Sequence, residues 1–512
     1  MEKKLELTRF VTQITNLFFM IRLFIYLFIV LLISCDESVQ AQENNDNEAS
    51  AEDILKEIRK LLSEEKLKNA SLGFYAIPVL SDKPLAEYNS EQSLSPASTL
   101  KIVTTSAALA VLGQDFVFET KLEYDGKITS EGTLEGNLYI KGGGDPTLGA
   151  NNLNALMDNW AKAIKDKGIK KINGILVGDA SIFEDHLTPD TWTWADMGNY
   201  YGAGACGLSI AENAYKIFFS AENKVGINAK FLRTEPQINN LEIVNEVQTG
   251  TSDSGDNAYI YGAPYSFLRY IRGTIPAGAN NFEIKGSLPD PALFCAEYLQ
   301  KKLIANGISC KEVSTDRLLK IKNKFSDDKR TVLHQTFSEA LKEIVKTINL
   351  ESMNLYAEHC LKMIAYKKTK EGSNAKGIEE ISNFLKSKKI DTNGLLMYDG
   401  CGLSRFNALT TKQLALILKT MQNENEFQSL FYSLPIAGKT GTMKNRCKGT
   451  VAEGNLRAKS GSVSGIRSFA GYVNSRSGKR IAFAIMVNNF SGSGSELAKK
   501  LEKIMVLLAQ QE

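Results

Sequence analysis

The chain has 512 residues, of which 43% are hydrophobic and 23% are charged, and its formal net charge at pH 7 is +3. This length and apolar content predict a folded protein with more than one domain. The charge balance lacks the basic excess that nucleic-acid binding requires, so we exclude nucleic acid as a partner.

The N-terminus has the pattern of an export signal. Basic residues precede the apolar run 23–33, and a run of about a dozen residues is too short to cross a membrane comfortably. The sequence Leu32-Ile33-Ser34-Cys35 resembles the bacterial lipobox, in which the cysteine carries a lipid. We expect a lipoprotein-type signal over 1–35, a lipid anchor at Cys35 and a disordered polar tether over 36–50. The protein would then be exported, on the periplasmic or outer-envelope face; an uncleaved anchor and plain secretion are the alternatives.

Regular structure is expected to begin after the tether. Apolar residues recur at helical spacing from Ala51 to Leu67. Two short apolar runs, 71–77 and 85–89, flank a stretch that includes Ser81-Asp82-Lys83-Pro84, which predicts a strand, a turn and a strand. This hairpin leads the chain to residue 95.

The stretch Ser95-Pro96-Ala97-Ser98-Thr99-Leu100-Lys101 runs into an apolar helical pattern over 102–112. If Ser98 opens that helix, the spacing of three residues places the Ser98 hydroxyl and the Lys101 ammonium on one face. A serine needs a base to become a nucleophile, and a lysine can serve only where burial or a nearby cation lowers its pKa. The pair alone is weak evidence, because a helix-capping serine with an exposed lysine has the same spacing.

Residues 119–329 differ from the preceding segments in their pattern of apolar residues. Short β-like runs, including 134–140 and 175–179, alternate with helical patterns such as 153–167. No second nucleophile–base pair occurs there, so we interpret the segment as an inserted, largely structural module. Its sharpest motif is Gly142-Gly143-Gly144-Asp145-Pro146-Thr147. We favour a tight turn that places Asp145 near a site over a phosphate-binding loop, because the Gly-Lys-Ser/Thr ending is missing.

Aromatic residues and cysteines give weaker signals. One aromatic cluster in the insert is either a sugar-stacking surface or, as we favour, core: Trp192, Trp194, Tyr200 and Tyr201. Six cysteines beyond Cys35 show neither Cys-x-x-Cys nor Cys/His spacing: Cys206, Cys295, Cys310, Cys360, Cys401 and Cys447. We therefore predict no metal site, and isolated buried thiols in preference to disulfides.

After the insert, an amphipathic pattern over 338–348 is followed by a break, and helical spacing resumes from Leu355 to Tyr366. The break contains Ser352-Met353-Asn354. On a turn between helices, the Ser352 hydroxyl and the Asn354 amide can project into a cleft, where they can relay a proton and hold a substrate amide. Taken alone, these residues are better explained as an ordinary helix cap.

The last segment offers two Lys-Thr/Ser-Gly motifs. Lys439-Thr440-Gly441 lies in a loop-like stretch, whereas Lys459-Ser460-Gly461 and Ser462 directly precede two expected strands, 468–473 and 480–488. A strand edge suits a cleft wall, so we favour the second motif. Lys459 would supply a fixed cation for a carboxylate, and Ser462 a backbone N–H for an oxyanion.

The three motifs together are close to the set found in penicillin-binding proteins and serine β-lactamases. The sequence resembles more narrowly the class C low-molecular-mass penicillin-binding proteins, which are D-alanyl-D-alanine carboxypeptidase/endopeptidases of the penicillin-binding-protein-4 type. Five phrases carry this resemblance over about 55–510: Pro96-Ala97-Ser98-Thr99-Leu100-Lys101, Gly143-Gly144-Asp145-Pro146-Thr147-Leu148, Ser352-Met353-Asn354-Leu355-Tyr356-Ala357-Glu358, Asp399-Gly400-Cys401-Gly402-Leu403-Ser404-Arg405 and Leu456-Arg457-Ala458-Lys459-Ser460-Gly461-Ser462. The family more often has threonine at Ser460 and serine at Cys401.

The resemblance implies an α/β (α+β) fold. Its catalytic domain would be of the serine β-lactamase/DD-peptidase type, with an antiparallel five-stranded sheet flanked by helices, and would comprise 51–118 and 330–512. The mixed α/β insert, 119–329, would form one or two small domains. From the residues we expect the hairpin near Leu72 and the strands near Lys459 to share this sheet, with the three motifs converging.

The resemblance also implies a mechanism and a substrate. Ser98 would attack the carbonyl between two terminal D-alanines of a peptidoglycan stem peptide, Lys101 would take its proton, and Ser352 would help to pass that proton to the leaving amine. Asn354 would hold the substrate backbone and Lys459 its terminal carboxylate, with help from Ser460, Gly461, Ser462 and Asp145. β-Lactams would acylate Ser98, and no cofactor is needed. A serine β-lactamase and a non-catalytic peptidoglycan-binding lipoprotein of the envelope are the alternatives.

Overall fold

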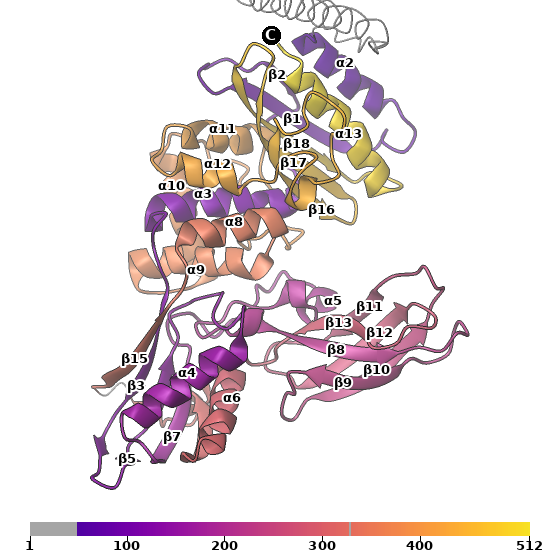
Figure 1. Ribbon diagram of the computed structural model, residues 1–512. Helices are drawn as coiled ribbons and strands as arrows, with labels where there is room; N and C mark the ends of the chain where they lie inside the picture. Colours follow the sequence, from indigo (N-terminus) through magenta and orange to yellow (C-terminus); the bar gives the residue numbers. More distant parts are fainter. Residues whose placement is uncertain (1–48, 327–328) are drawn as a thin grey trace, which may run out of the picture. The chain divides into compact units, whose positions relative to one another are not determined.

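The computed structural model describes residues 49–326 and 329–512 (Figure 1). Residues Ala49 to Glu512 form one compact unit. The expected signal 1–35 with Cys35 lies outside the described residues, as does most of the expected tether. The last tether residue, Ser50, is part of the fold, because its hydroxyl caps helix α2 at the Asp53 N–H.

A five-stranded antiparallel sheet in the order β16-β17-β18-β1-β2 confirms the expected catalytic-domain architecture. The strands are β1 (Ser71–Pro78), β2 (Ala86–Tyr88), β16 (Arg457–Val463), β17 (Ile466–Asn474) and β18 (Arg480–Asn488). Strands from the two ends of the sequence are thus neighbours. Strand β1 pairs with β18 along its whole length, which joins the hairpin to the C-terminal strands.

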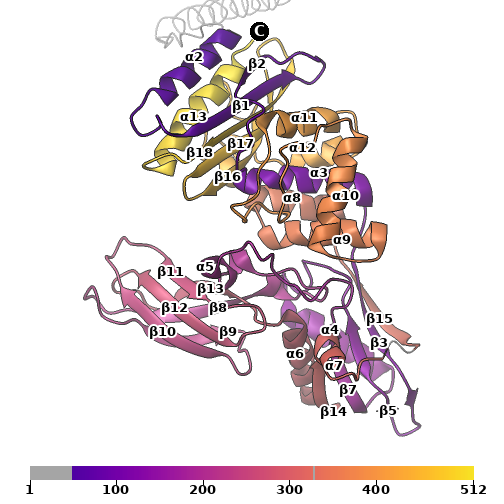
Figure 2. The same cartoon turned by 180° about the vertical axis from the view of Figure 1, so that it is seen from behind.

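Helices cover both faces of this sheet (Figures 1 and 2). Helices α2 (Ala51–Leu62) and α13 (Gly494–Ala509) pack on one face, while α11 (Thr411–Met421) packs on the other. The strands can serve two cores because successive side chains point to opposite faces. In β18, Phe483 joins the core under α13 and Ala484 joins the core under α11.

The second core surrounds α3 (Lys101–Leu112), whose residues from Lys101 to Leu109 are all buried. A helix that is enclosed on every side needs no polar face, which explains its apolar and small-residue sequence. The helices around it are α8 (Leu341–Glu351), α9 (Asn354–Thr369), α10 (Asn374–Ser387) and α12 (Phe427–Ser433). This bundle fixes the start of α3 beside the edge of the sheet, where a 3₁₀ turn, η1 (Ala97–Leu100), contacts β16.

The insert contains three further sheets (Figure 2). A mixed seven-stranded sheet comprises β3 (Glu119–Tyr124), β4 (Lys127–Ile128), β5 (Thr133–Glu135), β6 (Leu138–Lys141), β7 (Lys171–Asp179), β14 (Ser309–Thr315) and β15 (Thr331–Phe337). Helices α4 (Leu153–Asp166), α6 (Pro291–Ala305) and α7 (Asp316–Ile321) accompany it. Two three-stranded sheets comprise β8 (Ala214–Ser220), β9 (Lys230–Glu235) and β13 (Phe282–Ser287), and β10 (Glu242–Thr249), β11 (Asn257–Tyr261) and β12 (Leu268–Ile275).

Two details of the insert differ from the sequence expectation. The run 134–140 is not one strand, because the chain turns at Gly136, where an added Cβ would lie 2.3 Å from the Asp125 carbonyl oxygen. Strand β15 lies beyond the expected boundary at 330, yet it pairs with β3. The chain therefore leaves and re-enters the helical bundle through two neighbouring strands.

The six described cysteines are all buried free thiols, as expected. Within 49–326 and 329–512, no helix has both the length and the apolar character that crossing a membrane requires.

Candidate active site

Ser98 lies in η1, directly before α3. The preceding residue, Ala97, has a left-handed backbone with φ of 46°, a conformation that costs energy in residues other than glycine and that often occurs at functional sites. Lys101 Nζ lies 3.0 Å from Ser98 Oγ. The pair therefore has the contact that the sequence spacing predicted.

Lys101 is fully buried and donates two more hydrogen bonds. Its Nζ lies 2.7 Å from Asn354 Oδ1 and 2.7 Å from the Cys401 carbonyl oxygen. Burial lowers the pKa of Lys101 below its ordinary value, and the nearby charges oppose this shift only in part. A lysine with a lowered pKa beside a serine hydroxyl can act as its general base.

Ser352 and Asn354 lie where α8 ends and α9 begins. Ser352 has a left-handed backbone with φ of 62°, which ends α8 and turns the chain into the cleft. The Asn354 side chain accepts from Lys101 through Oδ1 and donates through Nδ2 to the Tyr201 carbonyl oxygen at 2.8 Å. Because both ends of the amide are bonded, its orientation is fixed, and one of the two bonds comes from the insert.

Lys459 is fully buried in β16, and its Nζ lies 2.9 Å from Ser352 Oγ and 2.8 Å from the Ser460 carbonyl oxygen. Burial, assisted by the positive charge of Lys101, holds the pKa of Lys459 well below its ordinary value. Lys459 Nζ thus contacts Ser352 of the Ser352-Met353-Asn354 motif directly and does not face open solvent. Lys439 is exposed and pairs with Glu453 Oε1 at 2.7 Å, so the structure brings only the second lysine motif to Ser352.

Gly461 permits the close approach of β16 to the nucleophile. A Cβ at this position would lie 2.6 Å from the Pro96 carbonyl oxygen and 3.1 Å from the Ser98 nitrogen. Any side chain would therefore push the strand away from η1. Next to it, Ser460 Oγ bonds Thr442 Oγ1 at 2.8 Å, while Ser462 is exposed and lines the cleft.

A cleft of about 710 Å³ opens over these groups. Ser98, Ser352, Asn354 and Ser462 line it from the catalytic side. The insert contributes Asp196, Tyr200, Tyr201, Glu212, Tyr259 and Lys285. The insert is therefore more than the largely structural module that the sequence indicates, because it supplies one wall of the cleft.

The aromatic cluster is partly core and partly exposed, so neither a core nor a surface interpretation holds for all of its members. Trp192 is buried and donates through Nε1 to Asp399 Oδ2 at 2.9 Å. Trp194 and Tyr200 are each about half exposed. Spacing alone could not separate the buried rings from the exposed ones, since the partners that bury Trp192 are distant in sequence.

The structure does not bring Asp145 into the cleft. Its carboxylate accepts from the backbone N–H and the hydroxyl of Thr147 at 2.8 and 2.7 Å, as in a tight turn. The same turn packs against α9, where His359 Nδ1 lies 2.8 Å from the Gly144 carbonyl oxygen. The predicted tight turn is present. It packs the insert against α9 and does not line the cleft.

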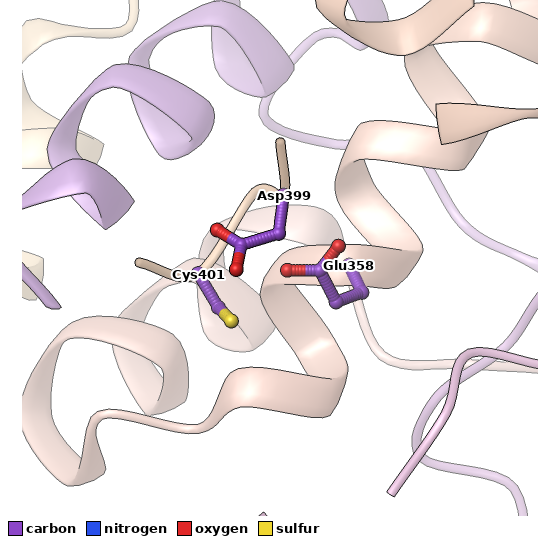
Figure 3. A group of neighbouring side chains, drawn as sticks. All are labelled: Glu358, Asp399 and Cys401. Carbon is purple, nitrogen blue, oxygen red and sulfur yellow. The ribbon is translucent and has the colours of Figure 1, made fainter. Parts of the chain in front are cut away.

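One group of buried side chains has the residue types of a metal site: Glu358, Asp399 and Cys401 (Figure 3). Sequence spacing does not reveal this group, because its members come together only in the fold. Asp399 already accepts four hydrogen bonds, from Trp192, Asn407 and the N–H groups of Gly402 and Ser404. Its lone pairs are occupied, so the group does not fit a metal ion.

Comparisons with known proteins identify the family and the fold. A family model described as the D-Ala-D-Ala carboxypeptidase 3 (S13) family matches residues 54–512. The chain is 28% identical over 452 residues to a D-alanyl-D-alanine carboxypeptidase of Actinomadura, across 86% of this chain and 82% of that protein. It is 27% identical over 444 residues to the D-alanyl-D-alanine carboxypeptidase DacB of Haemophilus influenzae, across 86% and 90%. The crystal structure of penicillin binding protein 4 from H. influenzae shares the fold, with a TM-score of 0.74 at 24% identity over 89% of this chain and 97% of that one.

Proposed function

The chain belongs to the D-Ala-D-Ala carboxypeptidase 3 (S13) family, and we propose that Ser98 is the nucleophile with which it hydrolyses the bond between the terminal D-alanines of peptidoglycan stem peptides. It is a serine-type, penicillin-binding peptidase. The observation that carries the residue assignment is the 3.0 Å contact between Ser98 Oγ and the buried Lys101 ammonium at the floor of the cleft.

In the acylation step, Lys101 takes the hydroxyl proton of Ser98 while Ser98 Oγ attacks the carbonyl carbon. The lowered pKa of Lys101 supports this role, because it raises the fraction of lysine that is uncharged near neutral pH. Asn354 and the Cys401 carbonyl keep the lysine nitrogen beside Ser98. Preorganised contacts of this kind reduce the reorganisation that the step requires.

The developing oxyanion accepts hydrogen bonds from the backbone N–H groups of Ser98 and Ser462. The close approach of Gly461 to Ser98 supports this assignment, because it brings β16 beside η1. Backbone donors fixed by a strand and a helix start need no reordering as charge develops.

Ser352 helps to pass the proton that Lys101 took from Ser98 on to the leaving amine. Lys459 Nζ, 2.9 Å from Ser352 Oγ, positions that hydroxyl. The terminal carboxylate of the substrate is held by Lys459, whose protonated form the carboxylate favours, with help from Ser460 and Ser462 on the same strand. Water then hydrolyses the ester on Ser98 and releases the shortened peptide.

A β-lactam would form the same ester, and its lifetime separates the proposal from a β-lactamase. We expect the purified protein to release D-alanine from an acyl-D-Ala-D-Ala peptide and to lose this activity after one equivalent of penicillin. Cross-linked dimeric stem peptides, assayed in parallel, measure endopeptidase action. Rapid, repeated penicillin hydrolysis would indicate a β-lactamase, and neither D-alanine release nor acylation would indicate a binding protein.

The N-terminal motif supports anchoring of this enzyme to an envelope membrane through a lipid on Cys35, with the catalytic domain exposed outside the cytoplasm. Cells expressing the full chain should incorporate a labelled fatty acid into it. The Cys35→Ala variant should not be labelled and should appear in the released fraction. Equal labelling of both proteins would contradict the anchor.

A further inference from the structure

Glu358, Asp399 and Cys401 form a buried cluster (Figure 3). Glu358 lies on α9, and the other two lie on the loop that follows α10. One ligand-type atom from each side chain lies within 4.8 Å of the others. Because the Cys401 carbonyl accepts from Lys101 Nζ at 2.7 Å, this loop forms part of the lysine's immediate surroundings.

The two carboxyl groups have very different partners. Asp399 accepts from Gly402 N and Asn407 Nδ2 through Oδ1, and from Ser404 N and Trp192 Nε1 through Oδ2, at 2.6–2.9 Å. Four donors are what an ionised carboxylate requires in a dry interior. Asp399 therefore provides the negative charge of the pair.

Glu358 has the surroundings of a neutral acid. Its Oε1 accepts one hydrogen bond, from Gly400 N at 2.9 Å, and among the described residues its buried Oε2 meets no nitrogen or oxygen donor, only the Cys401 thiol nearby. The neighbouring thiol of Cys401 is only a weak donor. Burial, followed by the negative charge of Asp399, raises the pKa of Glu358 to about 8.

The neighbouring positive charge of Lys362 offsets the raised pKa of Glu358 only in part. Lys362, one helical turn further along α9, is buried, but its Nζ bonds the His186 carbonyl oxygen at 2.7 Å and pairs with Glu184 Oε1 at 3.3 Å. Lys101 is committed to Ser98, Asn354 and Cys401. The insert contributes Trp192, which has no charge and bonds Asp399.

We propose that Glu358 is a positioning residue held as the neutral acid: it fixes the Asp399–Ser404 loop through Gly400 N without placing a second negative charge beside Lys101. This inference rests on the proposed function of Lys101 as the base. A second carboxylate would stabilise the ammonium form of Lys101 and so reduce the fraction of free base. The neutral acid provides the loop contact and avoids that cost.

The pH dependence of penicillin acylation tests the charge state. The acid limb of the second-order rate constant reports deprotonation of Lys101, and Glu358→Gln keeps the shape of the neutral acid. We expect this limb to move by less than about half a pH unit in Glu358→Gln, but downward by about one to three units in Asp399→Asn, which removes a real charge. Asp316→Asn, an equally buried carboxyl in the insert, is the matched control and should leave the limb unchanged. A downward shift in Glu358→Gln as large as that in Asp399→Asn would overturn the proposal.

Two further measurements separate this proposal from the proposed function. Glu358→Ala leaves Gly400 N without its partner and should acylate at least about tenfold more slowly than Glu358→Gln; equal rates would refute the positioning role. An infrared difference spectrum of wild type against Glu358→Gln needs no activity. It should contain a protonated-carboxyl stretch below about pH 7 that is lost above about pH 9, and its absence throughout would overturn the neutral acid. If no protein is acylated but the band is present, the proposed function fails while Glu358 remains a neutral acid.

Discussion

At the scale of single residues, Lys459 is distinguished from Lys439 by burial and by its contact with Ser352. Lys459→Ala should raise the activation free energy that kcat/KM for D-alanine release reports by about 2–4 kcal/mol, because Ser352 loses its hydrogen-bond partner and the substrate carboxylate loses the lysine that it would keep protonated. Lys439→Ala is the matched control. It should change the activation free energy that kcat/KM reports by less than about 0.5 kcal/mol, since it breaks only an exposed ion pair. The reverse ranking in steady-state kinetics would show that the wrong motif had been chosen.

The protonation state of Lys101 also makes the rate of penicillin acylation depend on pH. Its pKa is lowered by burial, so the uncharged base predominates above that lowered value and is lost as the pH falls through it. Penicillin acylation should therefore slow progressively toward acid and level off toward alkaline pH. Stopped-flow labelling across this range measures the profile, and a rate that rises toward acid would rule out Lys101 as the base.

At the scale of secondary-structure elements, helix α9 joins the catalytic bundle to the insert through His359. This residue is fully buried, with Nδ1 2.8 Å from the Gly144 carbonyl oxygen and Nε2 2.8 Å from Ser209 Oγ. Burial lowers its pKa to about 3, whereas an unfolded histidine titrates near 6.5. Below about pH 6.5 the unfolded chain binds a proton that the native state does not, so stability must fall as the pH falls toward 3.

The free energy of unfolding of the His359→Gln variant should fall less steeply with decreasing pH than that of the wild type. We expect the free energy of unfolding of the wild type to decline between about pH 6.5 and 4 by up to about 1.4 kcal/mol per unit more than that of the variant. Denaturant titrations at several pH values measure the difference. Parallel slopes for the two proteins would mean that His359 does not contribute.

The elements with strong periodicity were predictable. Strand β18 occupies the expected residues 480–488, and the hairpin of β1 and β2 formed as expected. The helix expected over 338–348 instead spans Leu341–Glu351, because Ser338 N bonds the Phe118 carbonyl and continues the strand pairing before the helix begins. Tertiary hydrogen bonds of this kind leave no local pattern in the sequence.

At the scale of the whole described unit, residues of the insert and of the sheet-and-helix region line the same cleft. Trp192 donates to Asp399, whose loop holds the Cys401 carbonyl against Lys101. Trp192→Phe should reduce stability by about 1–3 kcal/mol and slow acylation, because a buried carboxylate loses a donor. Trp160→Phe is the matched control: it also loses a buried bond, to Thr336 Oγ1 at 2.9 Å, but should lower stability alone. Equal acylation rates in the two variants would argue against this coupling.

The candidate site was partly predictable, because some of its residues are close in sequence. Ser98 with Lys101, and Ser352 with Asn354, are close in sequence, so short spacings indicated their proximity. The convergence of these pairs with Lys459 depended on combining three motifs. Glu358, Asp399 and the Tyr201 carbonyl could not be assigned from the sequence, because their roles arise from contacts between α9, a loop and the insert.

The most direct test of the account is the site of penicillin attachment. A fluorescent penicillin should add once per chain, and peptide mapping by mass spectrometry should place the ester on the peptide that contains Ser98. The adduct should be absent from Ser98→Ala and should form far more slowly in folded Lys101→Ala, because the serine has lost its base while the oxyanion donors remain. A stable adduct on another residue, or undiminished labelling of Ser98→Ala, would contradict the central claim that Ser98 is the nucleophile.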